Sequence, residues 1–190
     1  MDLTPLFASL ILVTLAELGD KTQLAIITLS SCFNALNVFI GAILALILVS
    51  GVGVVIGDFL AVFIPQYLVN IMSAVLFLLF GLFIILTRNK EEGFKKLDAK
   101  CGLLSVFSMV ALMELGDKTQ IAVIALAAEY NALLLVYIGV NISFILLTGL
   151  GVLLGKTLIR LIPVKSIKIV SGTIFLLFGT FLLLNTLRTF

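Results

Sequence analysis

The heptapeptide ELGDKTQ occupies residues 17–23, inside a long apolar stretch, and the same heptapeptide recurs at residues 114–120. Each copy places two carboxylates and one ammonium among residues that otherwise suit a membrane. Facing lipid, six such groups would cost on the order of 15–20 kcal/mol together, at roughly 2.5–3.5 kcal/mol each. That total exceeds the stability of a typical domain. The sequence therefore predicts that both motifs face the protein interior or water.

The chain around the two motifs is too apolar for an ordinary soluble domain. Of its 190 residues, 62% are hydrophobic and 12% are charged, and the mean hydropathy is +1.33. Soluble domains are about half apolar and a quarter charged. The apolar runs are long and unbroken, unlike the short alternating strands of a membrane barrel. We expect an all-α integral membrane protein in a lipid bilayer. The net charge of +2 says nothing about a nucleic-acid partner, and we expect none because no Lys/Arg stripe is interleaved with aromatic residues.

Six stretches are long enough to cross a bilayer, which takes about 20 apolar residues. They cover 5–30, 36–57, 67–87, 102–128, 132–155 and 166–187. The last three repeat the first three: a shift of 97 residues superposes the motifs, and a shift of 98 superposes the two FLLFG runs at 77–81 and 175–179. A repeat this long indicates duplication. Residues 1–87 form repeat 1, residues 88–101 a linker, and residues 102–190 repeat 2.

Each repeat holds an odd number of spans, so the second repeat should enter the membrane from the opposite side. Inverted-topology repeats of this kind are common in secondary transporters. Lys and Arg concentrate in 88–101 and in 156–168, and such loops are usually cytoplasmic. We therefore expect both termini outside a plasma membrane, with the 88–101 linker in the cytoplasm.

Helix geometry predicts where the motif side chains lie. In a continuous helix Glu17, Asp20 and Lys21 share one face, as do the corresponding residues of the second copy. Each motif begins about 17–18 Å from the end of its span, near the middle of a core about 30 Å thick. Gly19 and Gly116 fall off that face. We interpret them as sites of close helix packing, with a local helix break as the alternative, and the glycines at 53 and 57 also predict close packing.

The motif residues suit a hard divalent cation. Carboxylate, hydroxyl and amide oxygens bind Ca²⁺, Mg²⁺ and Mn²⁺, whereas softer metals prefer imidazole or thiolate. The chain has no histidine, and its two cysteines form no metal-binding pattern. The predicted metal ligands and proton carriers are Glu17, Asp20, Glu114 and Asp117. The predicted supporting residues are Lys21, Thr22, Gln23, Lys118, Thr119, Gln120 and Asn141, of which the lysines would hold carboxylates or balance charge.

Other readings of these residues stay open at this point. Glu and Lys four residues apart can form an ordinary intrahelical pair, so the motifs could simply lock two spans together. An exporter of an amino acid or another organic solute is a second reading, although four carboxylates would repel its carboxylate. An intramembrane aspartyl protease, with Asp20 and Asp117 as its dyad, is a third. Glu129, just beyond 102–128, is either a surface charge or a vestibule acid that attracts cations.

The two motifs also carry a family resemblance. Residues 17–22 and 114–119 match the pattern E-x-G-D-[KR]-[TS] at every specified position. The chain resembles the GDT family of cation/proton exchangers, related to the lysine-exporter superfamily, and its short loops resemble the prokaryotic manganese-exporter type. The resemblance covers nearly the whole chain. It implies a transporter, not an enzyme, that exchanges Mn²⁺ and/or Ca²⁺ for protons and needs no cofactor beyond the transported ion.

Overall fold

The computed structural model describes residues 2–86, 102–161 and 164–188, and within these ranges the chain is entirely helical, with eight helices and no strand. The prediction of an all-α protein is confirmed. The linker 88–101, which includes Cys101, lies outside the described residues. In chain order the helices are α1 (Thr4–Glu17), α2 (Lys21–Cys32), α3 (Ala35–Phe63), α4 (Gln66–Leu86), α5 (Leu103–Glu114), α6 (Lys118–Tyr130), α7 (Leu133–Leu161) and α8 (Val164–Arg188).

Three of these helices contain stretches that are long and apolar enough to cross a membrane by themselves. The stretches are Ala35–Phe63 in α3, Gln66–Phe83 in α4 and Leu133–Leu153 in α7. Shorter apolar helices cover Thr4–Glu17, Leu103–Glu114 and Gly172–Arg188. The membrane-crossing capacity of the chain is therefore clear for α3, α4 and α7 from length and composition.

The prediction of continuous helices over 5–30 and 102–128 is wrong. The chain leaves the helix at the Leu-Gly-Asp step of each motif. These three residues separate the end of α1 at Glu17 from the start of α2 at Lys21, and the same three residue types separate α5 from α6. The cause is local. Gly19 has φ +74° and Gly116 has φ +78°, a left-handed conformation that glycine adopts without the steric penalty of a side chain.

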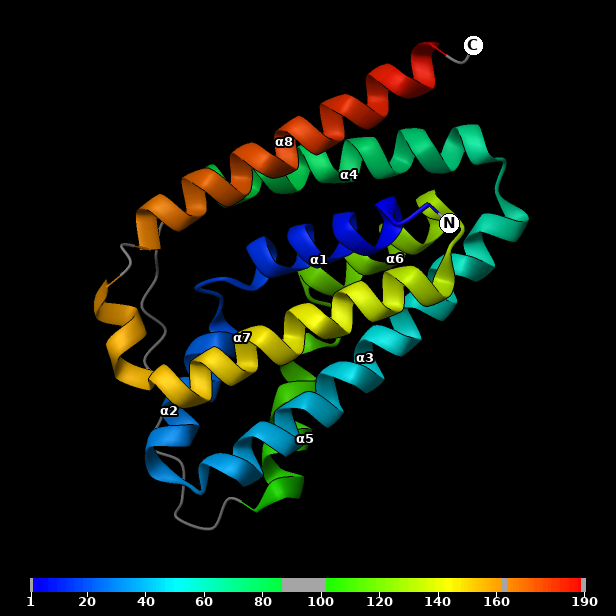
Figure 1. Ribbon diagram of the computed structural model, residues 1–190. Helices are drawn as coiled ribbons and strands as arrows, with labels where there is room; N and C mark the ends of the chain where they lie inside the picture. Colours follow the sequence, from blue (N-terminus) through cyan, green and yellow to red (C-terminus); the bar gives the residue numbers. More distant parts are fainter. Residues whose placement is uncertain (1, 87–101, 162–163, 189–190) are drawn as a thin grey trace.

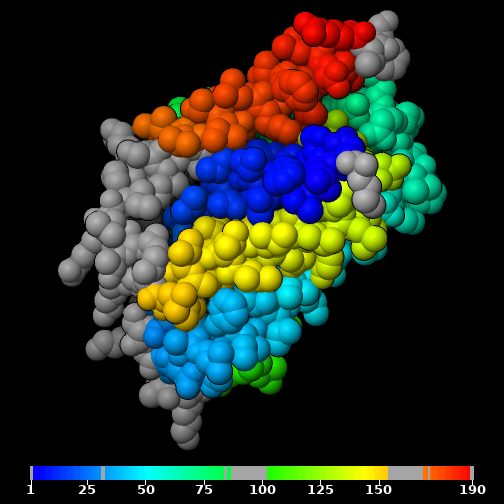
Figure 2. Space-filling model, in the orientation of Figure 1, coloured from blue at the N-terminus to red at the C-terminus, as the bar shows by residue number. Residues whose placement is uncertain are grey.

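The same helix contacts recur in both halves of the chain. The helix α1 packs on α7 as α5 packs on α3, and α2 packs on α7 as α6 packs on α3. The long helices α3 and α7 also contact each other between these pairs. Across the face shown in Figure 2, α8, α1, α7 and α3 lie side by side in that order. The two broken segments are thus held between long helices from both halves.

The α4 and α8 helices form a pair of their own beside this core (Figure 1). The rings of Phe77 and Phe175 lie 5.8 Å apart between centroids, and both side chains are fully buried. A Cβ on Gly81 would lie 2.7 Å from Leu176 Cγ, so the glycine allows the helices to approach closely. The pair reaches the core through α6 on one side and α1 on the other.

Close packing also joins α3 to α6, as the glycine pattern predicts. A Cβ on Gly57 would lie 2.4 Å from the Ile124 carbonyl oxygen, and a Cβ on Gly53 would lie 3.4 Å from Val123 Cγ1. The prediction of a small-residue contact at these two glycines is confirmed. The contact matters for the site because α6 carries the second motif at its first turn.

Candidate cation site

The two helix breaks are stabilised by glutamines of the motifs themselves. The Gly19 N–H donates to Gln23 Oε1 at 2.6 Å, and the Gly116 N–H donates to Gln120 Oε1 at 2.6 Å. Each glutamine sits in the first turn of the following helix and reaches back to the turn before it, as in a capping box. We predicted both glutamines as supporting oxygen donors. The structure shows these amide oxygens holding the backbone of the breaks.

The glycines act as turn residues. A Cβ on Gly116 would meet no atom within 4 Å, so the preferred interpretation of close helix packing is wrong for this residue, and the alternative of a local break is correct. A break ends the regular pairing of backbone N–H and carbonyl groups. The Gly19 N–H, which would pair with the Leu15 carbonyl in a continuous helix, bonds to Gln23 instead.

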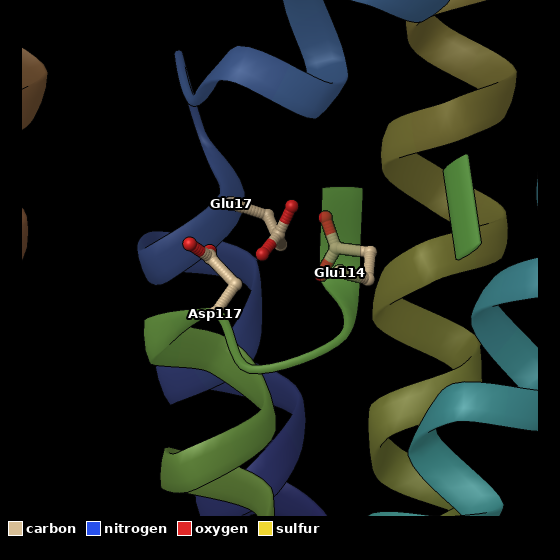
Figure 3. A group of neighbouring side chains, drawn as sticks. All are labelled: Glu17, Glu114 and Asp117. Carbon is tan, nitrogen blue, oxygen red and sulfur yellow. The ribbon is translucent and has the colours of Figure 1, made fainter. Parts of the chain in front are cut away.

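Three carboxylates from the two motifs come together at the breaks (Figure 3). Glu17, Glu114 and Asp117 each offer one oxygen, and these oxygens all lie within 4.8 Å of one another. Glu17 is 4% exposed and Glu114 is 1% exposed. Oxygens that bind one Ca²⁺ lie about 2.3–2.6 Å from the ion, hence at most about 5 Å from each other. The spacing suits a shared divalent cation.

Each glutamate is held by a threonine of the opposite motif. Thr22 Oγ1 donates to Glu114 Oε1 at 2.5 Å, and Thr119 Oγ1 donates to Glu17 Oε1. Both threonines are 1% exposed. A hydrogen bond to a metal-binding carboxylate orients it and tunes its affinity. The threonines therefore contact the glutamates as donors, and the site is assembled from both halves of the chain.

The lysines also cross between motifs. Lys21 Nζ lies 2.9 Å from Asp117 Oδ1, and Lys118 Nζ lies 2.6 Å from Asp20 Oδ1. The alternative of intrahelical Glu-Lys pairs does not match the structure, because each lysine pairs with an aspartate of the other half. The pairing also separates the aspartates into two ion pairs, which is not the arrangement of a protease dyad sharing a proton.

The second oxygens of the two aspartates are free for another partner. Asp20 Oδ2 and Asp117 Oδ2 are buried and accept no hydrogen bond in the described part of the chain. Asp117 belongs to the group of three carboxylates, whereas Asp20 does not. The structure thus brings three of the four predicted ligands together and leaves Asp20 beside them, tied to Lys118.

Asn141 does not join the motif residues through any hydrogen bond in the described part of the chain. Its Nδ2 donates to the Tyr137 carbonyl, one turn earlier in α7, at 2.8 Å. Its Oδ1 is buried and without a partner among the described residues. The interpretation of Asn141 as part of a polar network or as an added ligand remains a prediction.

Thr148, which the sequence analysis did not identify, lines the same small cavity as Glu17. A cavity of about 10 Å³, close to the smallest that can hold one water molecule, is lined by Glu17, Thr22, Gln23, Ile26, Leu46, Phe144, Leu147 and Thr148. Thr148 is 3% exposed, and Ser50, its counterpart in the first half, is also 3% exposed. A hydroxyl at the same place in SGVGVVIG and TGLGVLLG is the sequence signal that could have identified this position.

Comparisons with known proteins are consistent along the whole chain. The family model described as "Divalent cation/proton antiporter GDT1" matches residues 5–92 and 102–189. A Vibrio cholerae protein named "Putative manganese exporter" is 31% identical over 175 residues, covering 89% of this chain and 85% of that protein. A "GDT1-like protein" of Synechocystis sp. is 30% identical over 198 residues, covering 93% and 95%. A rice "GDT1-like protein 3" is 28% identical and covers 92% and 71%. No solved structure matches the chain.

Proposed function

Because the chain belongs to the GDT1 family of divalent cation/proton antiporters, we propose that it exports Mn²⁺ and/or Ca²⁺ from the cytoplasm in exchange for protons, at a carboxylate site formed by the two helix breaks. The observation that carries this proposal is the group of Glu17, Glu114 and Asp117, whose oxygens lie within 4.8 Å of one another. Oxygen ligands of this kind are those that Ca²⁺ and Mn²⁺ prefer.

A purely structural role explains this arrangement less well. The two Asp-Lys pairs would be enough to join the broken segments. Glu17 and Glu114 are buried beside them, and neither takes part in a salt bridge within the described ranges 2–86, 102–161 and 164–188. Buried charges are poor stabilisers compared with apolar packing. Two further buried carboxyl groups suit a site that takes up a cation.

Helix lengths support a site at mid-membrane. The four half-helices α1, α2, α5 and α6 have 12 to 14 residues, or about 18–21 Å each, and each is too short to cross a core of about 30 Å alone. If α1 and α2 together make one span, and α5 and α6 together make another, the eight helices form six spans in two inverted repeats. The breaks would then lie near the membrane centre, where transporters bind ions at interrupted helices.

The positions of the helix ends agree with this topology. In Figure 1 the start of α1 and the end of α8 lie on the same side of the molecule as the connections from α3 to α4 and from α6 to α7. The end of α2 and the starts of α3 and α5 lie toward the opposite side. Along the sequence, the basic segment 88–101 follows α4 and precedes α5, and the basic segment 156–168 covers the end of α7 and the start of α8. From this excess of Lys and Arg we infer that the end where α3 and α5 begin is cytoplasmic and that both termini lie outside a plasma membrane.

Exchange follows from competition for the same oxygens. Carboxylates must give up protons before they bind a metal ion, so metal entry releases protons and proton entry releases the metal. Lys21 and Lys118 keep one oxygen of each aspartate neutralised, and the clustered carboxylates of Glu17, Glu114 and Asp117 receive the cation. An inward proton gradient across the plasma membrane would then drive the metal ion out.

Flux measurements in liposomes test this function. The purified protein is reconstituted with a pH-sensitive dye inside, and Mn²⁺ is added outside, alone or with competing Ca²⁺ or Mg²⁺. We expect Mn²⁺ uptake coupled to proton release, and loss of both in Glu17→Gln and Glu114→Gln. The matched control is Thr28→Val, because the Thr28 hydroxyl donates within its own helix, to the Leu24 carbonyl at 2.8 Å, and to no other group among the described residues.

The outcomes separate the parts of the proposal. Wild-type protein that moves neither Mn²⁺ nor Ca²⁺ against protons would remove the proposed function. Coupled flux that survives unchanged in both glutamine variants would keep the function and reject these two ligands. Competition by Ca²⁺ or Mg²⁺ ranks the substrates.

A further inference from the structure

Glu129, a half-buried glutamate, lies outside the cation site, at the other end of α6. Glu129 is in the last turn of this helix, one residue beyond the predicted span 102–128. Our reading of Glu129 as a plain surface charge describes only the exposed part of this half-buried residue. Its Oε2 is buried and has no hydrogen-bond partner within the described residues, whereas a surface carboxylate would be solvated.

The surroundings of Glu129 come from α4 and are polar but uncharged. Gln66 Nε2 donates to the Glu129 carbonyl at 3.0 Å and to Asn70 Oδ1 at 2.9 Å. Ser73, 2% exposed, hydrogen-bonds the Glu129 carboxyl, and its hydroxyl also lies 3.3 Å from the Ala125 carbonyl. No lysine or arginine lies in α3, α4 or the described part of α7 before residue 154. The carboxyl group therefore has hydrogen-bonding neighbours and no counter-ion from these elements.

The titratable groups around this end are few. Tyr130 follows Glu129 in α6, and Asp2, which precedes α1, interacts electrostatically with Tyr130. Besides the motif residues, the described side chains of the helices packed on α6 contribute Asp58 from α3, Tyr67 from α4 and Tyr137 from α7. Burial raises the pKa of Glu129 to about 7, and the Ser73 hydrogen bond opposes part of that rise. The end of a helix also disfavours negative charge, because the carbonyl groups there already carry partial negative charge.

The location relates Glu129 to the cation site along one helix. Lys118, Thr119 and Gln120 occupy the first turn of α6, and Glu129 lies 11 residues after Lys118, or about 16 Å along the axis. Between them α6 presents Ala122, Val123, Ala125 and Leu126, all buried. The close contact between Gly57 of α3 and Ile124 packs α3 tightly against this part of α6. In this conformation Glu129 and the site are separated by packed apolar side chains.

We propose that Glu129 is an outer proton-binding site of the exchange cycle, where a proton from the extracytoplasmic water is held before it reaches the carboxylates at the helix breaks. This inference rests on the proposed function. Glu129 Oε2 takes a proton from external water while the interval along α6 is closed, and releases it inward when α3 and α6 move apart. The first half has Cys32 at the corresponding position. Only the second half therefore carries an acidic residue there, and the proton-binding site is on one membrane side only.

External pH dependence of metal efflux tests this role. Right-side-out membrane vesicles containing the full protein are loaded with Mn²⁺ at fixed internal pH, and efflux is followed at external pH values from 6 to 8. A group whose pKa is about 7 goes from about 90% to about 10% protonated over this range. The smaller proton gradient at high external pH slows both proteins, and only the wild type also loses protonation of Glu129. We therefore expect wild-type efflux to fall about tenfold more than Glu129→Gln efflux over this range.

Three further variants make the result specific. Glu129→Asp keeps a carboxyl group and should retain a steep profile. Ser73→Ala removes the hydrogen bond that lowers the pKa of Glu129, so the midpoint of the profile should move to higher external pH. Asp58→Asn removes another acid, near the end of α3 that precedes α4, and should leave the profile unchanged.

The two proposals fail in different ways. Absence of proton-coupled Mn²⁺ efflux from wild-type vesicles would remove the proposed function. Wild-type efflux together with a Glu129→Gln profile identical to wild type would overturn the outer proton site alone. A Ser73→Ala midpoint that stays in place would also count against it, since the hydroxyl would then not act on the proton-binding group.

Discussion

The two motifs have the same seven residues and make the same bonds, yet their surroundings differ. Each threonine bonds the opposite glutamate, each lysine pairs with the opposite aspartate, and each glutamine holds its own glycine. Asp117 nevertheless joins the three-carboxylate group and Asp20 does not. The Lys21 side chain is 41% exposed and that of Lys118 is 22% exposed. A small cavity borders Glu17.

This comparison shows which features the duplication determines. Contacts within and between the motifs depend on residues that are identical in both copies, so they come out alike. The surroundings depend on helices whose sequences have diverged, as with Glu129 and its counterpart Cys32 or Asn141 and its counterpart Ile43. The following predictions test how far the two motifs are equivalent.

The largest expected difference concerns the aspartates. Asp117→Asn should lower the rate of Mn²⁺/H⁺ exchange at least about 100-fold, because Asp117 is one of the clustered carboxylates, whereas Asp20→Asn should cost about 10-fold, as expected for a residue that orients others. Initial rates in liposomes measure both. Equal losses would contradict the distinction and indicate that Asp20 joins the site in another conformation.

A smaller effect is expected at the threonines. Thr22→Val and Thr119→Val keep the side-chain shape but remove the hydroxyl that bonds a buried glutamate. Each should raise the KM for Mn²⁺ by about 10-fold, and the two increases should agree within experimental error. An unchanged KM for either variant would mean that the glutamate needs no orienting donor.

The helix break itself should contribute to stability. Gly116→Ala places a side chain at φ +78° and should cost about 1–2 kcal/mol, or roughly 2–8 °C in the thermal midpoint for a chain of this size. Gly102→Ala is the matched control, because a Cβ there also meets nothing within 4 Å and its φ is −80°. Equal midpoints for both variants would show that the left-handed turn is not strained by a side chain.

The smallest effect is expected at Asn141. Asn141→Ile introduces the residue found at the corresponding position in the first half, and removes a buried oxygen that has no partner among the described residues. We expect an unchanged KM for Mn²⁺ and a change in unfolding free energy of about 1 kcal/mol or less. A KM that rises several-fold would instead make Asn141 a ligand that distinguishes the halves.

Several properties of this protein follow from the sequence alone. The apolar composition predicts a helical membrane protein, the 97-residue shift reveals the duplication, and the two E-x-G-D-[KR]-[TS] motifs indicate the family that the comparisons confirm. These properties depend on residue type and spacing along the chain. The cost of placing charge in a membrane also singles out the four acidic residues of the motifs as candidates for the site.

Only the tertiary structure decided how these residues meet. Helical periodicity placed Lys21 on a face with Glu17, but the left-handed glycine ends the helix and Lys21 pairs with Asp117 from the other half. Periodicity describes a regular helix and cannot locate a single residue with positive φ. Partners about 100 residues apart depend on how α1 to α7 pack, as does the contact of Glu129 with α4. Packing therefore converts two identical motifs into one asymmetric site.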